Sequence, residues 1–203
     1  MQKSFVIGLV SIVAILGVGA VLVRDYYLAS HQVRVKADTT ASDTRYFIDT
    51  IAKTARQIGQ EYDLYASVII AQAVLESNHG QSTLAKSPYH NLFGIKGSYR
   101  GSQVKMTTWE DDGNGNSYQI DAVFRAYPNV ESSLYDYARI LESDYYAGVH
   151  KSNTSSYLDA TAALTGTYAT DTNYATKLNH IITTYHLTVY DTVSVGVNPF
   201  ATN

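Results

Sequence analysis

The feature that most constrains this chain is a run of 19 uncharged residues near its N-terminus, from Phe5 to Val23. A helix of that length would be about 29 Å long, which is close to the thickness of the hydrocarbon layer of a bilayer. The run therefore predicts a transmembrane or signal helix within residues 1–31. Val18-Gly19-Ala20 is a candidate cleavage site for a signal peptide. Because the apolar run continues past this site, we favour a retained anchor.

The part of the chain after residue 31, roughly 170 residues, is long enough for one domain with a hydrophobic core. The whole chain has 15 basic and 18 acidic residues and no basic run, so nucleic acid is not expected as a partner. It has no cysteine, which excludes disulfide bonds, a thiolate zinc site and a cysteine nucleophile. Its 18 tyrosines suit the binding of sugars, because each ring is apolar and each hydroxyl is polar.

Apolar periodicity beyond residue 43 predicts an α+β fold that is mostly α-helical, with one small β-hairpin lobe. Residues 32–43 are polar and aperiodic and are expected to form a linker, followed by the domain at 44–190 and a flexible tail at 191–203. Helices are expected around 47–58 and over 65–77, 130–143, 155–165 and 172–186, the third and last of them capped by Asn129 and Asp171. The hairpin strands are expected at 103–109 and 118–127.

Glu76 is the first candidate for a catalytic residue because it lies at the end of the most apolar of these helices. Seven of the eight residues from Val68 to Leu75 are apolar, with Gln72 as the exception, so this helix is expected to be buried on nearly all sides. Burial raises the pKa of a carboxyl group, which suits a general acid at neutral pH. A glutamate at a helix end can equally turn outward into solvent. The polar loop that follows, 77–82, favours the interpretation that Glu76 lies in the wall of a cleft.

A second carboxylate is needed if the reaction is the hydrolysis of a glycoside, and Glu110 is the best candidate. It lies at the end of the first hairpin strand, and Asp111, Asp112 and Asp121 are rivals on the same lobe. Each of these carboxylates, taken alone, is more simply explained as a solvated side chain of a hairpin. The turn after Glu110 is similar to the start of a calcium loop, but it lacks the glycine and the glutamate that such a loop requires, so no metal site is expected.

Five segments stand out, in this order along the chain: AQAVLESNHGQSTLA (71–85), NLFGIKG (91–97), TTWE (107–110), FRAY (124–127) and YATDTNYATKL (168–178). Together they resemble the glycoside hydrolase family 73 glucosaminidases, which include bacterial autolysins and the muralytic domain of flagellar rod-cap proteins. The resemblance covers about 45–188, nearly the whole of the expected domain. It implies a lysozyme-like fold with a β-lobe and hydrolysis of the β-1,4 bond after N-acetylglucosamine in peptidoglycan.

The same resemblance implies roles for particular residues. Glu76 falls on the general acid of the family and Glu110 on the carboxylate of the β-lobe, although the long acidic turn leaves the choice among residues 110–112 open. Tyr168 is implied as a catalytic tyrosine that binds the acetamido group or stacks on a sugar ring. The implied substrate-binding residues are Tyr174, Asn91 and Phe93, although Tyr174 could instead simply pack in the first turn of a helix. Apart from the resemblance, Trp109 lies beside the second carboxylate and could stack on a sugar or anchor the hairpin to the core.

We therefore expect a peptidoglycan hydrolase, an endo-β-N-acetylglucosaminidase that acts as a monomer without a metal or other cofactor. The second carboxylate would act as a base or stabilise the developing cation, unless the acetamido group of the substrate attacks instead. Two alternatives remain open. One is a muramidase or lytic transglycosylase on the same fold, and the other is a non-catalytic module that binds the wall.

The expected location is extracytoplasmic, with the domain membrane-anchored through the N-terminal helix or secreted, and acting at the bacterial cell wall. Lys3 precedes the apolar run, and Arg24, Arg34 and Lys36 follow it. This distribution of charge would by itself place the domain in the cytoplasm. We place it outside nevertheless, because a hydrolase of the wall has to reach the wall.

Overall fold

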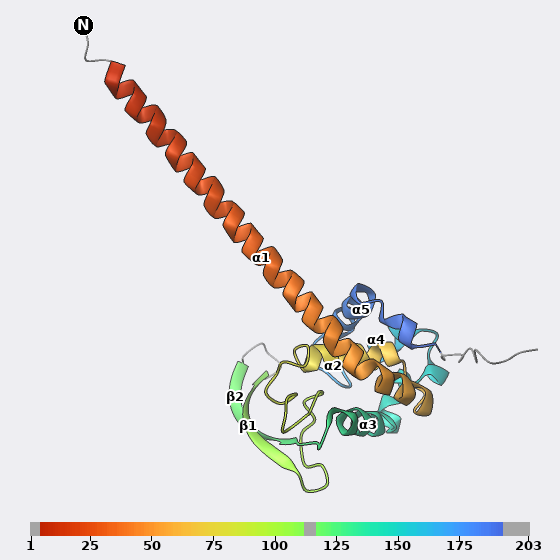
Figure 1. Ribbon diagram of the computed structural model, residues 1–203. Helices are drawn as coiled ribbons and strands as arrows, with labels where there is room; N and C mark the ends of the chain where they lie inside the picture. Colours follow the sequence, from red (N-terminus) through yellow and green to blue (C-terminus); the bar gives the residue numbers. More distant parts are fainter. Residues whose placement is uncertain (1–4, 112–116, 193–203) are drawn as a thin grey trace, which may run out of the picture. The chain divides into compact units, whose positions relative to one another are not determined.

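The computed structural model of the chain (Figure 1) describes residues 5–111 and 117–192, with side chains described from residue 28 onwards except at 35, 37, 38, 109–111, 117 and 118. The chain divides into two compact units, Met1–Asp43 and Thr44–Asn203. The second unit is mostly helical and carries a two-stranded sheet, so the expected α+β class of the domain is confirmed. The tail beyond residue 192 and Asp112 lie outside the described residues.

Helix α1 extends without interruption from Phe5 to Glu61. It includes residues 32–43, so the stretch that was expected to be an aperiodic linker is helical. Since neither glycine nor proline occurs between Gly19 and Gly59, nothing in the backbone interrupts a helix over that stretch. A transmembrane or signal helix was expected within residues 1–31, and most of the side chains of this segment lie outside the described set. Among the residues that are described, no helix is long and apolar enough to cross a membrane.

Helix α2, Ala66–Glu76, is the centre of the hydrophobic core of the second unit. Every residue from Ala66 to Val74 is buried, which confirms the expected burial on nearly all sides. Helices α4 (Tyr157–Leu164) and α5 (Tyr174–Thr184) both contact α2 and each other. Because its neighbours cover it all round, α2 holds the residues at its C-terminal end in a fixed position.

The β-lobe is an antiparallel hairpin of strands β1, Gln103–Asp111, and β2, Ser117–Arg125, which lie beside each other in Figure 1. The expected alternation holds in β2, where Ala122 and Phe124 are buried and Asp121 is exposed. An isolated bridge between Lys96 and Phe124 ties the preceding loop to the hairpin. This bridge places the loop 91–97 between the lobe and the helical core.

The remaining helices lie close to their expected positions, with shorter ends. Helix α3, Val130–Leu141, begins at the predicted cap, since the side chain of Asn129 accepts a hydrogen bond from the amide of Ser132 at 2.8 Å. Helix α5 begins later than expected, because Asp171 accepts from the amide of Asn173 at 2.9 Å in the turn before the helix. Short 3₁₀ helices at Asp144–Val149, Lys151–Asn153 and Leu187–Tyr190 were not expected from the sequence.

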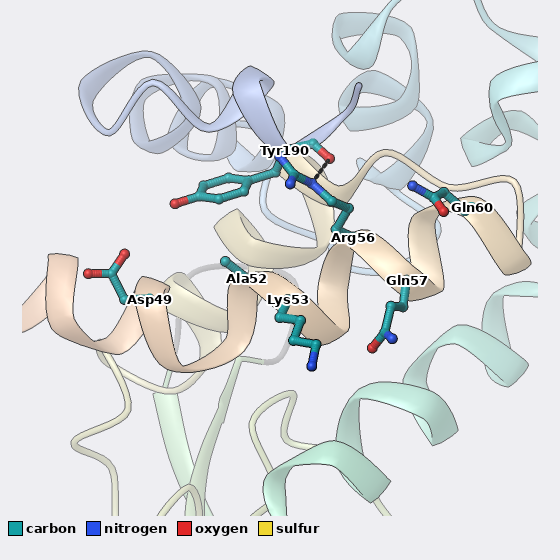
Figure 2. A pocket seen from close by; sticks show the side chains of 7 residues that line it. All are labelled: Asp49, Ala52, Lys53, Arg56, Gln57, Gln60 and Tyr190. Carbon is teal, nitrogen blue, oxygen red and sulfur yellow. Dashed lines mark hydrogen bonds between the residues drawn. The ribbon is translucent and has the colours of Figure 1, made fainter. Parts of the chain in front are cut away.

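The last described turn of the chain is fastened to α1 and α2 and is not a flexible segment. The guanidinium of Arg56 on α1 donates to the carbonyl oxygens of Val189 and Tyr190 at 2.8 and 3.4 Å, and the second of these bonds is drawn in Figure 2. Asp191 accepts from the amide of Ser67 at 2.8 Å, in the first turn of α2. Residue 191, which was expected to start a flexible tail, is therefore held to the domain, because Asp191 caps the first turn of α2 from outside the helix.

Candidate active site

The C-terminal end of α2 is closed by a sharp loop that fixes the position of Glu76. Ser77 donates to the carbonyl oxygen of Ala73 at 2.5 Å and accepts from the amide of Gly80 at 2.7 Å. Asn78, His79 and Gly80 all have positive φ angles, of 50°, 58° and 75°. A hydrogen bond of 2.7 Å between Thr44 and His79 ties this loop to α1. The chain therefore turns away from the helix axis immediately after Glu76.

Glu76 lines a cleft of about 500 Å³ between the helical core and the β-lobe. Its lining combines aromatic rings, apolar side chains and a few polar groups: Glu76, Phe93, Gly94, Ile95, Lys96, Thr108, Phe124, Tyr137, Ile140, Tyr146 and Tyr168. This is the composition expected of a site that stacks on sugars and orients them with few hydrogen bonds. Glu76 itself lines the cleft, but the loop 77–82, which was expected to form its wall, contributes none of the lining residues.

A second hollow of about 510 Å³ lies along α1 and is shown in Figure 2. Its wall consists of side chains from α1 together with Tyr190, and Asp49 is its one carboxylate. None of the site residues predicted from the sequence lines it. The cleft at Glu76 is therefore the candidate active site.

The carboxyl group of Glu76 accepts a hydrogen bond from the hydroxyl of Tyr174, with 2.7 Å between Tyr174 Oη and Glu76 Oε1. The side chain is exposed on the cleft side, while the protein around it withdraws it from bulk water. This desolvation raises the pKa of Glu76 above its usual 4.5, against the opposing effects of the hydrogen bond from Tyr174 and the charge of Lys177. A carboxyl group with a raised pKa that faces a cleft can act as a general acid.

Three tyrosines and Phe93 form an aromatic cluster next to Glu76. The rings of Phe93 and Tyr137 stack with their centroids 4.0 Å apart, and those of Tyr168 and Tyr174 stack at 6.0 Å. Burial and the nearby charge of Glu76 raise the pKa of each tyrosine hydroxyl well above its usual value of 10.0. All three hydroxyls are therefore protonated and neutral at physiological pH, so they can donate hydrogen bonds.

The predicted binding residues occupy different positions in and around this cleft. Phe93 and Tyr168 line it, and the hydroxyl of Tyr168 donates to the carbonyl oxygen of Phe93 at 3.0 Å. Tyr174 is buried behind Glu76. Asn91 is also buried, and its amide bonds four backbone groups, donating to the carbonyl oxygens of Ile95 and Arg125 at 2.9 Å each and accepting from the amides of Phe93 and Ile95. Asn91 thus shapes the loop that borders the cleft.

Trp109 and Glu110 lie on β1, where they pair with Gln119 and Tyr118 of β2, but their side chains are outside the described set. The rival carboxylate Asp121 binds two neighbouring side chains of the hairpin. It forms an ion pair with Lys105 at 2.9 Å and accepts from the hydroxyl of Thr107 at 2.9 Å, and these contacts lower its pKa. Asp121 therefore remains ionised on an exposed face of the hairpin.

Sequence reasoning missed several residues that the structure places in the site. Gln72 was noted only as the polar exception in an apolar run, yet it is fully buried and bonded to two of the cluster tyrosines. The sequence did contain an indication of this role, because Gln72 lies four residues before the candidate acid Glu76 and therefore on the same face of the helix. Tyr137, Tyr146 and Lys96 also line the cleft. Lys96 belongs to the NLFGIKG segment that carried the resemblance, whereas no pattern in the sequence distinguishes Tyr137 and Tyr146 from other core or surface residues.

A mostly helical domain with a hairpin lobe, and a desolvated carboxyl group in an aromatic cleft between them, has the parts of a glycoside hydrolase. Residues 52–187 match the family described as mannosyl-glycoprotein endo-β-N-acetylglucosaminidase. The chain therefore belongs to the glucosaminidase family, glycoside hydrolase family 73, as its sequence motifs indicated.

The chain is also similar to individual proteins and to solved structures. The chain is 50% identical over 185 residues to an autolysin of Enterococcus faecalis, covering 88% of this chain and 25% of that protein. It is 42% identical over 193 residues to a probable N-acetylmuramidase of Lactococcus lactis subsp. cremoris, covering 89% of this chain and 44% of that protein. The catalytic domain of the autolysin Auto from Listeria monocytogenes has the same fold, with a TM-score of 0.69, 47% identity and coverage of 78% of this chain and 96% of that one. The chain spans less than half the length of these two curated relatives.

Proposed function

We propose that this domain hydrolyses the β-1,4 glycosidic bond after N-acetylglucosamine in the glycan strands of peptidoglycan. The observation that carries the proposal is the environment of Glu76, a desolvated carboxyl group with a raised pKa that faces an aromatic cleft and is held by Tyr174. Membership of the glucosaminidase family supports the choice of substrate and bond. No metal or cofactor is required for this chemistry.

In the proposed mechanism, Glu76 donates its proton to the departing glycosidic oxygen while positive charge develops at the anomeric carbon. Glu110 is the proposed second carboxylate, acting as a base or stabilising the cation. The hairpin register supports this choice, because position 110 falls on the same face of β1 as Thr108, which lines the cleft. Positions 109 and 111 fall on the opposite face. Attack by the acetamido group of the substrate is the alternative in which Glu110 only assists.

The aromatic side chains of the cleft are the proposed sugar platform. Phe93 and Tyr168 both line it, and the raised pKa of Tyr168 keeps its hydroxyl protonated beside the sugar. Tyr174 would act on Glu76 more than on the substrate, since it is buried behind the acid. Asn91 would contribute by holding the loop that carries Phe93. For Trp109 the register favours an anchoring role in the hairpin over stacking on the sugar, because position 109 falls on the face of β1 opposite Thr108.

We further propose that residues 1–31 anchor the chain in the membrane or act as a signal peptide, and that the domain at 44–190 acts as a monomer outside the cytoplasm at the cell wall. The uncharged run from Phe5 to Val23 supports the first statement. The location of peptidoglycan supports the second. A tag placed after residue 190 that proved accessible only from the cytoplasm would overturn the proposed location.

The test of the activity is the chemistry of the new chain ends. Purified peptidoglycan is digested with the purified chain, reduced with borohydride and analysed by mass spectrometry, with Glu76→Gln in parallel. Reduced N-acetylglucosamine ends that are absent with the variant are the expected result. Reduced or anhydro N-acetylmuramic acid would reassign the bond, which the name of the Lactococcus relative makes the alternative to test. Binding of glycan without any new ends would point to a wall-binding module.

A further inference from the structure

A chain of three hydrogen bonds runs from the core of the domain to Glu76. Gln72 lies fully buried on α2, one helical turn before Glu76. The hydroxyl of Tyr137 on α3 donates to Gln72 Oε1. Gln72 Nε2 donates to the hydroxyl oxygen of Tyr174 at 3.0 Å, and that hydroxyl donates to Glu76 Oε1 at 2.7 Å. Three helices therefore contribute to the orientation of one carboxyl group.

The order of donors in this chain follows from the protons that each group has. A tyrosine hydroxyl has a single proton, whereas an amide has two donors on nitrogen and an acceptor on oxygen. Because Tyr137 donates to the amide oxygen of Gln72, the amide nitrogen faces Tyr174. Because that nitrogen donates to the hydroxyl oxygen of Tyr174, the proton of Tyr174 is free to point at Glu76. The three bonds share one direction, and bonds aligned in this way polarise one another.

We propose that Gln72 is a positioning residue that holds the hydroxyl of Tyr174 as a donor to Glu76 Oε1, so that Glu76 carries its acid proton on Oε2. This inference rests on the proposed role of Glu76 as the general acid. In the reaction, the proton leaves Oε2 for the departing glycosidic oxygen, which also receives the electron pair of the broken bond. The carboxylate left on Glu76 keeps its hydrogen bond from Tyr174.

The amide of Gln72 has a further consequence for the direction of proton transfer. Without a donor on its oxygen, the hydroxyl of Tyr174 could accept the proton of Glu76 as a hydrogen bond, and the acid would then face away from the substrate. By occupying the acceptor side of that hydroxyl, Gln72 leaves the substrate as the acceptor for Glu76. Among the described residues, the charged group that acts on Glu76 is Lys177 of α5, which is itself paired with Asp171 at 2.6 Å.

The test compares two substitutions of Gln72 in the full chain. Gln72→Met keeps the length of the side chain and removes both hydrogen bonds, so we expect kcat on soluble peptidoglycan fragments to fall about tenfold with KM within about twofold, the scale of one misdirected hydrogen bond. The alkaline limb of the pH profile should move upward by about one pH unit, because the freed hydroxyl of Tyr174 can then accept a hydrogen bond from protonated Glu76 and favours its neutral form. A carboxyl-detected NMR titration of Glu76 should show the same upward shift of its pKa.

Gln72→Glu is a conservative variant whose effect on kcat depends on pH. Its protonated side chain can accept from Tyr137 and donate to Tyr174, so kcat at acidic pH should be within about threefold of the wild-type value. Its ionised side chain accepts from both tyrosines and draws the hydroxyl of Tyr174 away from Glu76, so kcat should fall steeply as the pH rises. A variant that only damaged packing would show no such recovery at acidic pH.

Thr161→Val is the matched control, because it removes a partly buried hydrogen bond of 2.8 Å from the buried Thr161 to Asn179, and neither residue lines the cleft. It should lower the melting temperature and leave kcat and the pKa of Glu76 unchanged. Wild-type values of kcat, pH limb and Glu76 pKa in Gln72→Met would overturn the positioning role, as would an equal fall of kcat in the control. If the wild-type chain cleaved no glycan while the pKa of Glu76 still moved in Gln72→Met, the proposed function would fail and the positioning role would stand.

Discussion

Gly80 closes the loop after α2, and the substitution Gly80→Ala tests whether that loop is as tightly packed as the structure indicates. The residue has φ +75°, and a Cβ built on it would lie 2.5 Å from Cδ2 and 2.7 Å from Cε2 of the Phe47 ring. The left-handed backbone costs an alanine about 1–2 kcal/mol, and overpacking against the partly buried ring of Phe47 adds about 1–3 kcal/mol. We therefore expect Gly80→Ala to lower the free energy of unfolding by about 2–5 kcal/mol.

Gly166→Ala separates the two contributions. Gly166 has φ +82°, but no atom lies within 4 Å of a Cβ built on it, so this substitution should cost only the backbone contribution of about 1–2 kcal/mol. For a domain of this size each kcal/mol corresponds to about 2–4 °C in the melting temperature. Thermal unfolding followed by far-UV circular dichroism should thus show a larger fall for Gly80→Ala than for Gly166→Ala.

The double variant Phe47→Ala/Gly80→Ala completes the test, since removal of the ring removes the overlap. Its loss of stability should be smaller than the sum of the two single losses by about 1–3 kcal/mol. Equal melting temperatures for Gly80→Ala and Gly166→Ala, or strict additivity in the double variant, would refute the reasoning. Either result would mean that Phe47 moves aside without cost.

Three further predictions concern charged groups of the domain. The pKa of Glu76 is raised in the folded state above its unfolded value of 4.5, so the wild-type protein loses stability as the pH rises from the unfolded-state pKa to the folded-state pKa. Glu76→Gln should therefore melt at a higher temperature than wild type at about pH 7 and at the same temperature at about pH 3. Asp136→Asn removes the charge that holds Arg125 at 2.6 Å, and urea unfolding should show a loss of about 1–3 kcal/mol. Asp191→Ala removes the cap on the amide of Ser67 and should cost about 1–2 kcal/mol in the same assay.

The parts of the fold that could be predicted are those encoded by short-range patterns. The apolar run from Val68 to Leu75 predicted a buried helix, and the alternation in 118–127 predicted a half-buried strand; both were confirmed. The continuation of α1 through 32–43 was missed, because polarity was interpreted as irregularity. Helix propensity depends on the absence of glycine and proline as well as on apolar spacing, and that stretch contains neither.

The candidate site was only partly predictable, because its key contacts join residues far apart in the chain. Glu76 could be selected from its place at the end of a buried helix. The hydrogen bond from Tyr174 spans 98 residues and that from Tyr137 to Gln72 spans 65, and no local pattern encodes either. Asn91 lies in a recognised motif and was predicted to bind substrate, but its side chain bonds backbone groups of its own loop.

The partner of Glu76 explains how a carboxyl group in this position can remain an acid. The apolar residues that bury α2 bring Glu76 to the helix C-terminus, where both desolvation and the negative end of the helix dipole disfavour its ionised form. A lysine or arginine in the place of Tyr174 would reverse this by stabilising the carboxylate. A tyrosine whose own pKa is raised by burial stays neutral. It can therefore donate to the carboxyl group in either protonation state of Glu76, and the acid proton of Glu76 stays available for the substrate. The neutral aromatic cluster around Glu76 thus allows its carboxyl group to be both held in place and protonated.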